Sequence, residues 1–171
     1  FLNGWKFTFD AMFSKTLNNV FFKNLAITKS GYTYGVNAEV GASNPASKAP
    51  LYSIDKTYYA VVALDNTNKG YTYSISGQLE KHFNFGLDLM ASYTFGHAYS
   101  VNDGTSSVAY SNWKYNYSID TNAPELSHSL FDRPHKIMAV VSYTTPIYLR
   151  GLQSTISLSY EAGSGQRYSY T

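Results

Sequence analysis

The residue types that most often carry chemistry are few in this chain, and their spacing matches no known catalytic or metal site. The histidines are His82, His97, His128 and His135. None of them belongs to an HExxH motif or stands at ligand spacing from a carboxylate. The absence of cysteine excludes thiolate metal sites and disulfides, and no serine lies in a G-x-S-x-G elbow. The sequence therefore predicts no enzyme, no catalytic residue, no metal and no cofactor.

Two short polar clusters could bind a ligand, but a structural role explains each of them. The stretch DRPHK contains a proline that sets the turn into a strand, and we expect Asp132 to pair locally with Arg133 or Lys136. The stretch VNDGTSS begins like a calcium loop but lacks the later acidic ligands. We expect it to form an ordinary Asn-Asp-Gly turn.

The best candidate for ligand recognition is the aromatic stretch YSNWKYNYS. Its candidate ligand-binding residues are Tyr110, Trp113, Tyr115 and Tyr117. Exposed aromatic rings in a loop can stack on sugars or pack on a peptide. The alternative is that these rings pack on neighbouring loops and have a structural role.

Alternation of apolar and polar residues dominates the rest of the chain, whereas helical patterns are almost absent. Five segments alternate and predict long strands: residues 4–14, 58–83, 86–96, 135–145 and 154–163. The first strand could continue through residues 15–27. In the stretch GLDLMASYTFG one face carries Leu87, Leu89, Ala91, Tyr93 and Phe95, and the other carries Asp88, Ser92 and Thr94. The apolar face could touch either the inside of a sandwich or lipid.

The connections between these strands alternate in length. Long ones at about residues 28–57 and 100–134 alternate with short turns at about residues 83–86 and 148–153. Sandwiches favour short connections, whereas outer-membrane barrels have short turns inside and long loops outside. The sequence thus predicts an all-β, antiparallel transmembrane β-barrel segment. Five strands cannot close a barrel, so residues 1–171 are interpreted as a fragment of one larger barrel domain.

The composition agrees with a β-barrel membrane protein and argues against a nucleic-acid partner. Charged residues make up 14% of the chain and the net charge is +2, without a basic cluster, so no nucleic-acid partner is expected. The sequence contains no run of about 18 apolar residues, so no transmembrane helix is predicted. The polar faces carry mostly Ser, Thr, Gln and Asn, as the wall of a water-filled lumen does.

Several motifs resemble one family of membrane proteins. The stretch ALDNTNKGYTYSISGQLEKHFNFGLDLMASYTFG resembles a strand–turn–strand of TonB-dependent outer-membrane transporters. TSSVAYSNWKYN, FDRPHKIMAVVSY and SLSYEAGSGQRYSY are similar to later parts of the same barrels, in particular those of Oar-like and SusC-like receptors. The resemblance covers nearly all of the chain from about Trp5.

This resemblance implies a barrel of roughly 22 strands with an N-terminal plug, of which the chain would supply about a quarter and no part of the plug. It implies a location in the outer membrane of a Gram-negative cell and the import of a large nutrient, a peptide or a glycan. The implied partners are outer-membrane lipid, the remainder of the barrel and plug, TonB acting through that plug, and a surface lipoprotein.

Two other interpretations of the sequence stay open. One is a soluble or surface-exposed β-sandwich, acting as a binding or adhesin module. The other is a small complete outer-membrane barrel, in which each long segment counts as two strands.

Overall fold

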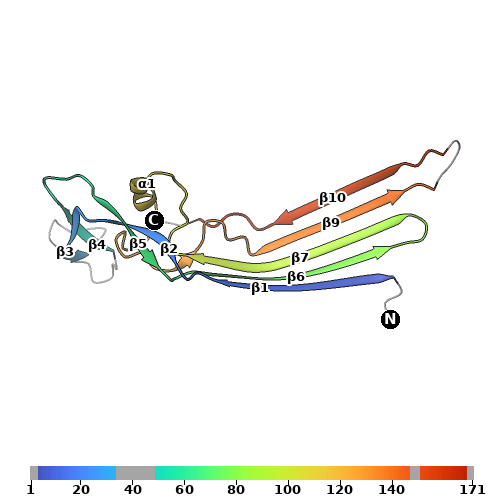
Figure 1. Cartoon of the computed structure of the whole chain (residues 1–171), viewed down its shortest axis with the longest axis horizontal. Coiled ribbons are helices and arrows are strands. Elements are labelled where there is room, and N and C mark those ends of the chain that lie inside the picture. The colour runs from blue at the N-terminus through green and yellow to red at the C-terminus, as the bar shows by residue number, and fades with distance from the viewer. Residues whose placement is uncertain (1–3, 34–48, 147–150, 169–171) are drawn as a thin grey trace. The chain divides into compact units, whose positions relative to one another are not determined.

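The computed structural model describes residues 4–33, 49–146 and 151–168, and the chain is mostly β-strand (Figure 1). Its contacts divide it into two compact units, which we describe separately. The first unit comprises the described parts of residues 1–14, 71–98 and 131–167. The second comprises those of residues 15–70, 99–130 and 168–171. Within the described part of the chain, no helix is long and apolar enough to cross a bilayer.

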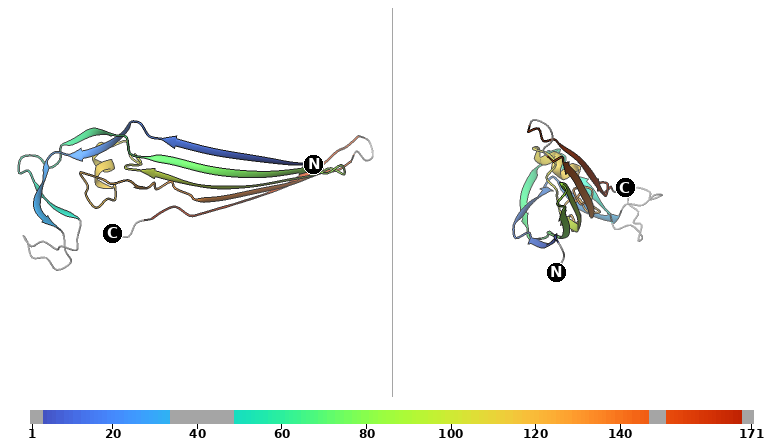
Figure 2. Two further views of the ribbon diagram at one scale, coloured as in Figure 1. Left: turned by 90° about the horizontal axis from the view of Figure 1, so that it is seen from below. Right: turned by 90° about the vertical axis from the view of Figure 1, so that its right-hand side faces the viewer.

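The first unit contains one antiparallel sheet. In spatial order its long strands are β1 (Trp5–Lys15), β6 (Tyr71–His82), β7 (Leu87–Ser100), β9 (His135–Thr144) and β10 (Thr155–Gly163). Neighbouring strands run in opposite directions (Figure 1), and the left view of Figure 2 shows them side by side. The all-β, antiparallel prediction is confirmed, and each of the five predicted segments overlaps one of these strands. The segment predicted at residues 58–83 is divided, because β5 (Val62–Thr67) precedes β6 as a separate strand, and β7 continues beyond the predicted end at residue 96.

The strand register places residues of like character on the same face of this sheet. Leu89 of β7 pairs with Val141 of β9, which pairs with Leu158 of β10. The adjacent row pairs Asp88 with Ser142, and that serine with Ser157. Because side chains alternate between the two faces of a strand, every second row is apolar. The period-2 prediction therefore holds across neighbouring strands as well as along each one.

The apolar face carries large side chains that remain exposed. Phe7 of β1 is 61% exposed and Leu158 of β10 is 72% exposed. Further exposed apolar residues on this face are Phe9, Phe13, Ile75, Leu79, Tyr93, Ile137, Val141, Tyr143, Ile156 and Tyr160. The first unit thus has a broad apolar surface that its own described residues leave uncovered.

The opposite face is held together by hydroxyl groups and ion pairs. Hydroxyl pairs join neighbouring strands at Ser76–Thr94 (2.9 Å), Ser142–Ser157 (2.7 Å) and Thr144–Thr155 (3.1 Å). Two ion pairs, Lys6–Glu80 at 3.1 Å and Lys136–Glu161 at 3.0 Å, also link adjacent strands. These contacts satisfy polar groups across the sheet, and the same face also carries Met90 and Val140, which pair with each other.

The short turn between β6 and β7 forms where it was predicted. The Gly86 amide donates to the Phe83 carbonyl at 3.0 Å, and Gly86 has a φ of +93°. A Cβ at Gly86 would lie 2.2 Å from the Thr144 carbonyl oxygen, so only glycine fits here. Residues 148–150 of the turn predicted at residues 148–153 lie outside the described residues, and the Thr145 amide donates to the Ser154 carbonyl at 2.8 Å.

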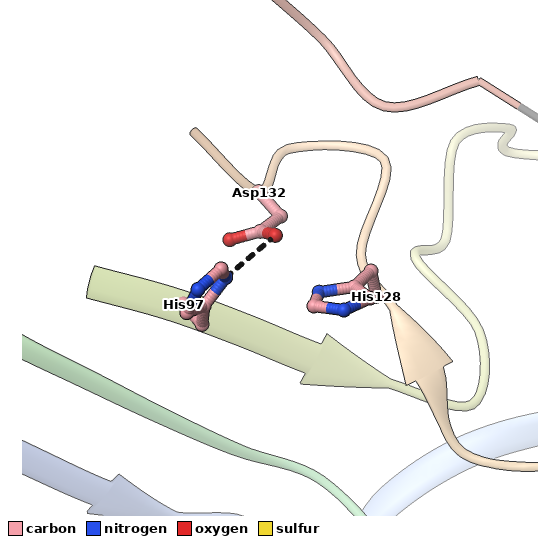
Figure 3. A group of neighbouring side chains, drawn as sticks. All are labelled: His97, His128 and Asp132. Atoms are coloured by element: carbon pink, nitrogen blue, oxygen red, sulfur yellow. Dashed lines mark hydrogen bonds and ion pairs between the residues drawn. The ribbon is translucent and has the colours of Figure 1, made fainter. Parts of the chain in front are cut away.

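Asp132 has different partners from those expected, and the prediction of a local pair was wrong. Its carboxylate is 1% exposed and accepts hydrogen bonds from His97 Nδ1 (3.1 Å), the Ala98 amide (3.0 Å) and Arg167 Nε (3.0 Å). Figure 3 shows the pair with His97; the His128 that it also draws belongs to the second unit. Asp132 therefore ties the segment before β9 to β7 and to the chain after β10.

The pKa of the Asp132 carboxyl follows from these partners. Burial acts to raise it, but the hydrogen bonds from His97, Ala98 and Arg167 hold the pKa below the ordinary value of 3.8. A lowered pKa means that folding favours the ionised form.

The second unit contains more regular structure than the predicted loops allowed. Its elements are β2 (Asn19–Asn24), β3 (Ile27–Thr33), β4 (Pro50–Ile54), β5 (Val62–Thr67), α1 (Ala109–Lys114) and β8 (Ser127–His128). β2 pairs with β5, β3 pairs with β4, and β8 pairs with Tyr99 and Ser100 at the end of β7. The connection predicted at residues 28–57 therefore contains strands, and that at 100–134 contains a helix and a short strand.

Replacing Asp132 with alanine should destabilise the protein by about 1–3 kcal/mol, because the Ala98 amide loses its acceptor and the partly exposed Arg167 and His97 lose this carboxylate. Asp132→Asn should remove the pH-dependent contribution of this carboxylate to the free energy of unfolding. That contribution is present above pH 3.8 and is lost as the pH falls through the lower folded-state pKa. Urea unfolding at several pH values measures both effects. Glu125→Gln, at an exposed acid, is the control and should change stability by less than about 0.5 kcal/mol.

Candidate ligand-binding site in the second unit

Strands β2 and β5 form the base of the candidate site. Phe21 pairs with Asp65 across the strands, and Lys23, two residues further along β2, lies on the same face. The Lys23 ammonium makes an ion pair with the Asp65 carboxylate and lies 5.0 Å from the centre of the Phe21 ring. The hydrogen bond from Lys23 is the main reason that the pKa of Asp65 is lowered. One face of this small sheet thus presents a ring beside a donor–acceptor pair.

The end of β2 is fixed by two asparagines that are far apart in the sequence. Asn24 is 2% exposed, and its Oδ1 accepts hydrogen bonds from the amides of Ala26 and Val61, each at 3.0 Å. Asn122 holds the backbone of Asn24 from the other side: its Oδ1 accepts from the Asn24 amide, and its Nδ2 donates to the Asn24 carbonyl, both at 2.8 Å. Since buried backbone groups need partners, this pair fixes residues 120–124 against β2.

Asp120 anchors the same segment to the β3–β4 sheet. Its carboxylate accepts hydrogen bonds from the amides of Asn122 (3.0 Å) and Ala123 (3.1 Å), pairs with Lys29 at 2.6 Å, and accepts the hydroxyl of Tyr52. Burial and the Asp120 carboxylate raise the pKa of Tyr52 to about 12. Burial also acts to raise the pKa of Asp120, yet hydrogen bonds from Lys29 and Tyr52 hold it below its ordinary value.

Between the β2–β5 sheet and this anchored segment lies a groove of about 550 Å³. Its lining residues are Asn18, Phe21, Lys23, Asp65, Asn66, Thr67, Asn68, Lys69, Val101, Asn122, Ala123 and Pro124. Most of these side chains are polar, and four of them are amides, which donate and accept hydrogen bonds at once. A volume of several hundred Å³ is that of a small-ligand site. The groove is therefore the candidate binding site that the geometry offers.

Two of the predicted aromatic residues are brought together on α1. The rings of Tyr110 and Trp113 lie 5.6 Å apart, and Tyr59 joins them at 6.0 Å from Tyr110, with 3.2 Å between the two hydroxyls. Trp113 Nε1 donates to Asn122 Oδ1 at 3.0 Å, so this ring supports the wall of the groove. None of the four predicted residues is among those that line it.

The other two predicted residues lie at and beyond the end of α1. Lys114 Nζ lies 5.4 Å from the centre of the Tyr115 ring and 5.9 Å from that of Tyr110. Tyr117 is 64% exposed. Their role in ligand binding stays a prediction.

The stretch VNDGTSS forms the turn that was predicted. The Gly104 amide donates to Asn102 Oδ1 at 2.8 Å, which makes an Asx turn, and Gly104 has a φ of +60°. Asp103 accepts hydrogen bonds from Ser100 Oγ (2.5 Å), Ser129 Oγ (2.7 Å) and the Leu130 amide (2.7 Å). Its carboxylate is therefore used to close the loop.

Asn122→Ala should destabilise the second unit by about 1–3 kcal/mol, because the backbone of Asn24 and the Trp113 indole each lose a hydrogen-bond partner. Hydrogen exchange measured by mass spectrometry should be faster over residues 20–26. The control is Asn68→Ala, which changes another amide of the groove at an exposed position. Equal protection in both variants would refute the anchoring role of Asn122.

Comparison of the chain with protein-family models, with curated proteins and with solved structures finds no match. A function is therefore argued below from the residues and contacts of the chain itself.

Proposed function

We propose that this chain forms part of the wall and outer loops of an outer-membrane transporter of the TonB-dependent class, which imports a large nutrient such as a peptide or a glycan. The observation that carries the proposal is the exposed apolar face of the five-strand sheet, matched by a polar opposite face. Monomeric soluble proteins rarely expose an apolar patch larger than a few hundred Å². Lipid covers such a face in a membrane barrel.

The paired length of the strands agrees with a membrane span. β7 and β9 pair without interruption from Leu87↔Tyr143 to Phe95↔His135. This register joins nine consecutive residues of each strand, and a tilted membrane strand needs about 9–11 residues. No bulge interrupts the register, so the apolar side chains stay on one face throughout.

Aromatic side chains gather at both ends of the apolar face. Near the β6–β7 turn, Lys81 Nζ lies 5.2 Å from the Trp5 ring centre and 5.3 Å from that of Phe83. At the other end the rings of Phe13 and Tyr71 stack at 6.4 Å. Barrels carry such girdles where the strands meet the headgroups, so the two rows mark the boundaries of the proposed membrane layer.

The open order of the sheet supports a larger barrel rather than a small complete one. β1 and β10 lie at the two ends of the strand order, and the described strands do not pair them with each other. Unpaired strand edges are not tolerated in hydrocarbon. We therefore infer that further strands of the same barrel flank β1 and β10. A sandwich is less well supported, because the first unit contains a single sheet.

The position of the loops in the chain also fits the proposal. The second unit is built from the connections between β1 and β6 and between β7 and β9. In an antiparallel sheet, both of these connections leave from the same end. The opposite end has the short β6–β7 turn. In a barrel of this class the elaborate end faces outward, which puts the groove and the α1 aromatic residues on the ligand side.

Ala91→Arg should prevent assembly of the protein in the outer membrane, whereas Ser92→Arg should be tolerated. Ala91 lies in the middle of the paired span on the apolar face, where arginine costs about 2–4 kcal/mol in lipid. Ser92 faces the other side, toward Met138 and Glu161. Assembly is measured from the amount of heat-modifiable protein in outer-membrane fractions. Equal assembly of the two variants would contradict the assignment.

A second measurement tests the same faces without adding a charge. Residues 1–171 contain no cysteine, so single spin labels can be placed from residue 87 to residue 95 once any cysteine outside these residues is replaced by serine. In vesicles, access to oxygen should be high and access to a water-soluble nickel chelate low at every odd position, with the reverse at every even one. The absence of this alternation would reject a lipid-facing sheet.

A further inference from the structure

We propose that the groove between β2, β5 and residues 122–124 binds an oligosaccharide that carries carboxylate groups. This inference rests on the proposed function, since it names the class of nutrient that the outer loops would take. It also identifies a site other than the aromatic stretch at residues 110–117. The evidence is the chemistry of the lining and the way in which the walls are held.

The floor of the groove suits a sugar ring. The C–H face of a pyranose packs against an aromatic ring, and Phe21 supplies one. The Lys23 ammonium lies over one face of that ring, 5.0 Å from its centre, and pairs with the Asp65 carboxylate, so a donor and an acceptor stand together next to the face that stays open to a sugar. Adjacent sugar hydroxyls present the same pattern, because each hydroxyl both donates and accepts.

The rim of the groove offers further neighbouring hydrogen-bond donors and acceptors, as several linked sugars would need. Asn66 Nδ2 donates to Asn18 Oδ1 at 3.0 Å, which leaves the remaining donor and acceptor sites of both amides for a ligand. Asn68 and Thr67 continue the polar rim. Val101, Ala123 and Pro124 add aliphatic surface beside the Phe21 ring, on which the C–H groups of a sugar can also pack.

The charge of the lining favours an acidic sugar over a neutral one. The charged residues of the lining are two lysines, Lys23 and Lys69, and one carboxylate, that of Asp65. Lys23 is paired with Asp65. Within the described residues no ion pair is made by Lys69, which is exposed at the rim. A ligand carboxylate at this lysine gains a charge-assisted hydrogen bond.

The wall opposite Phe21 is fixed before any ligand arrives. Asp120 and Asn122 hold residues 122–124 through backbone hydrogen bonds, and Pro124 is buried. A groove whose wall is already ordered loses less conformational entropy on binding. This is a property of a binding site rather than of an accidental surface depression.

The test is calorimetric titration of the full protein in detergent with three probes. Hexagalacturonic acid has both hydroxyls and carboxylates, maltohexaose has hydroxyls only, and hexaglutamate has carboxylates without sugar rings. We expect hexagalacturonic acid to bind at least tenfold more tightly than either of the others. Phe21→Leu, which keeps an apolar side chain but removes the ring, should weaken that binding at least tenfold.

A matched pair of lysine variants tests the charge. Lys69→Gln should weaken hexagalacturonic acid binding about fivefold, whereas Lys56→Gln, at an exposed lysine of the same unit outside the groove, should leave it unchanged. Thermal melting shows whether each variant is folded. Equal binding of all three probes, no binding of any, or equal effects of the two lysine variants would overturn the inference. If the spin-label alternation is nevertheless found, the proposed function stands and only the ligand assignment fails.

Discussion

The register of the five-strand sheet is the constraint on which the rest of the first unit depends. A shift of one residue between β7 and β9 would move Leu89 and Ala91 to the polar face and would bring Asp88 to the apolar one. Hydroxyl pairs such as Ser76–Thr94 and Ser142–Ser157 form only in the observed register. The polar face therefore fixes the position of the apolar face, although the apolar face has no core to pack into.

The second unit is organised by polar side chains rather than by an apolar core. Within the described residues the buried apolar side chains are only those of Ala26, Val101 and Pro124, whereas Asn24, Asn102 and Asn112 are buried and hydrogen-bonded. The side-chain amide of each asparagine makes hydrogen bonds to backbone groups that have no partner in a neighbouring strand. Side-chain amides thus order these long connections without a large apolar cluster.

The sequence predicted the strands well because their alternation is a local property. All five long strands overlap the segments that the pattern predicted, and the turn at Gly86 was found. The pattern did not predict that residues 58–83 divide into β5 and β6, which belong to different sheets. The same method missed α1, because a helix of six residues is too short to show a repeating apolar stripe. It also missed β3 and β4, since Ile27–Thr33 is mostly polar and was interpreted as loop.

The long-range polar contacts could not be predicted from the sequence, for a different reason. The Asn24–Asn122 bond joins residues 98 positions apart, and neither asparagine belongs to a motif. The same holds for Asp132, whose neighbours Arg133 and Lys136 were nearer in sequence than Arg167. A buried carboxylate needs several directed donors at once, and Lys136 does not supply one because it lies in β9 and pairs with Glu161. Partners in β7 and in the chain after β10 do supply such donors, which is why burial selects the distant residues over the adjacent ones.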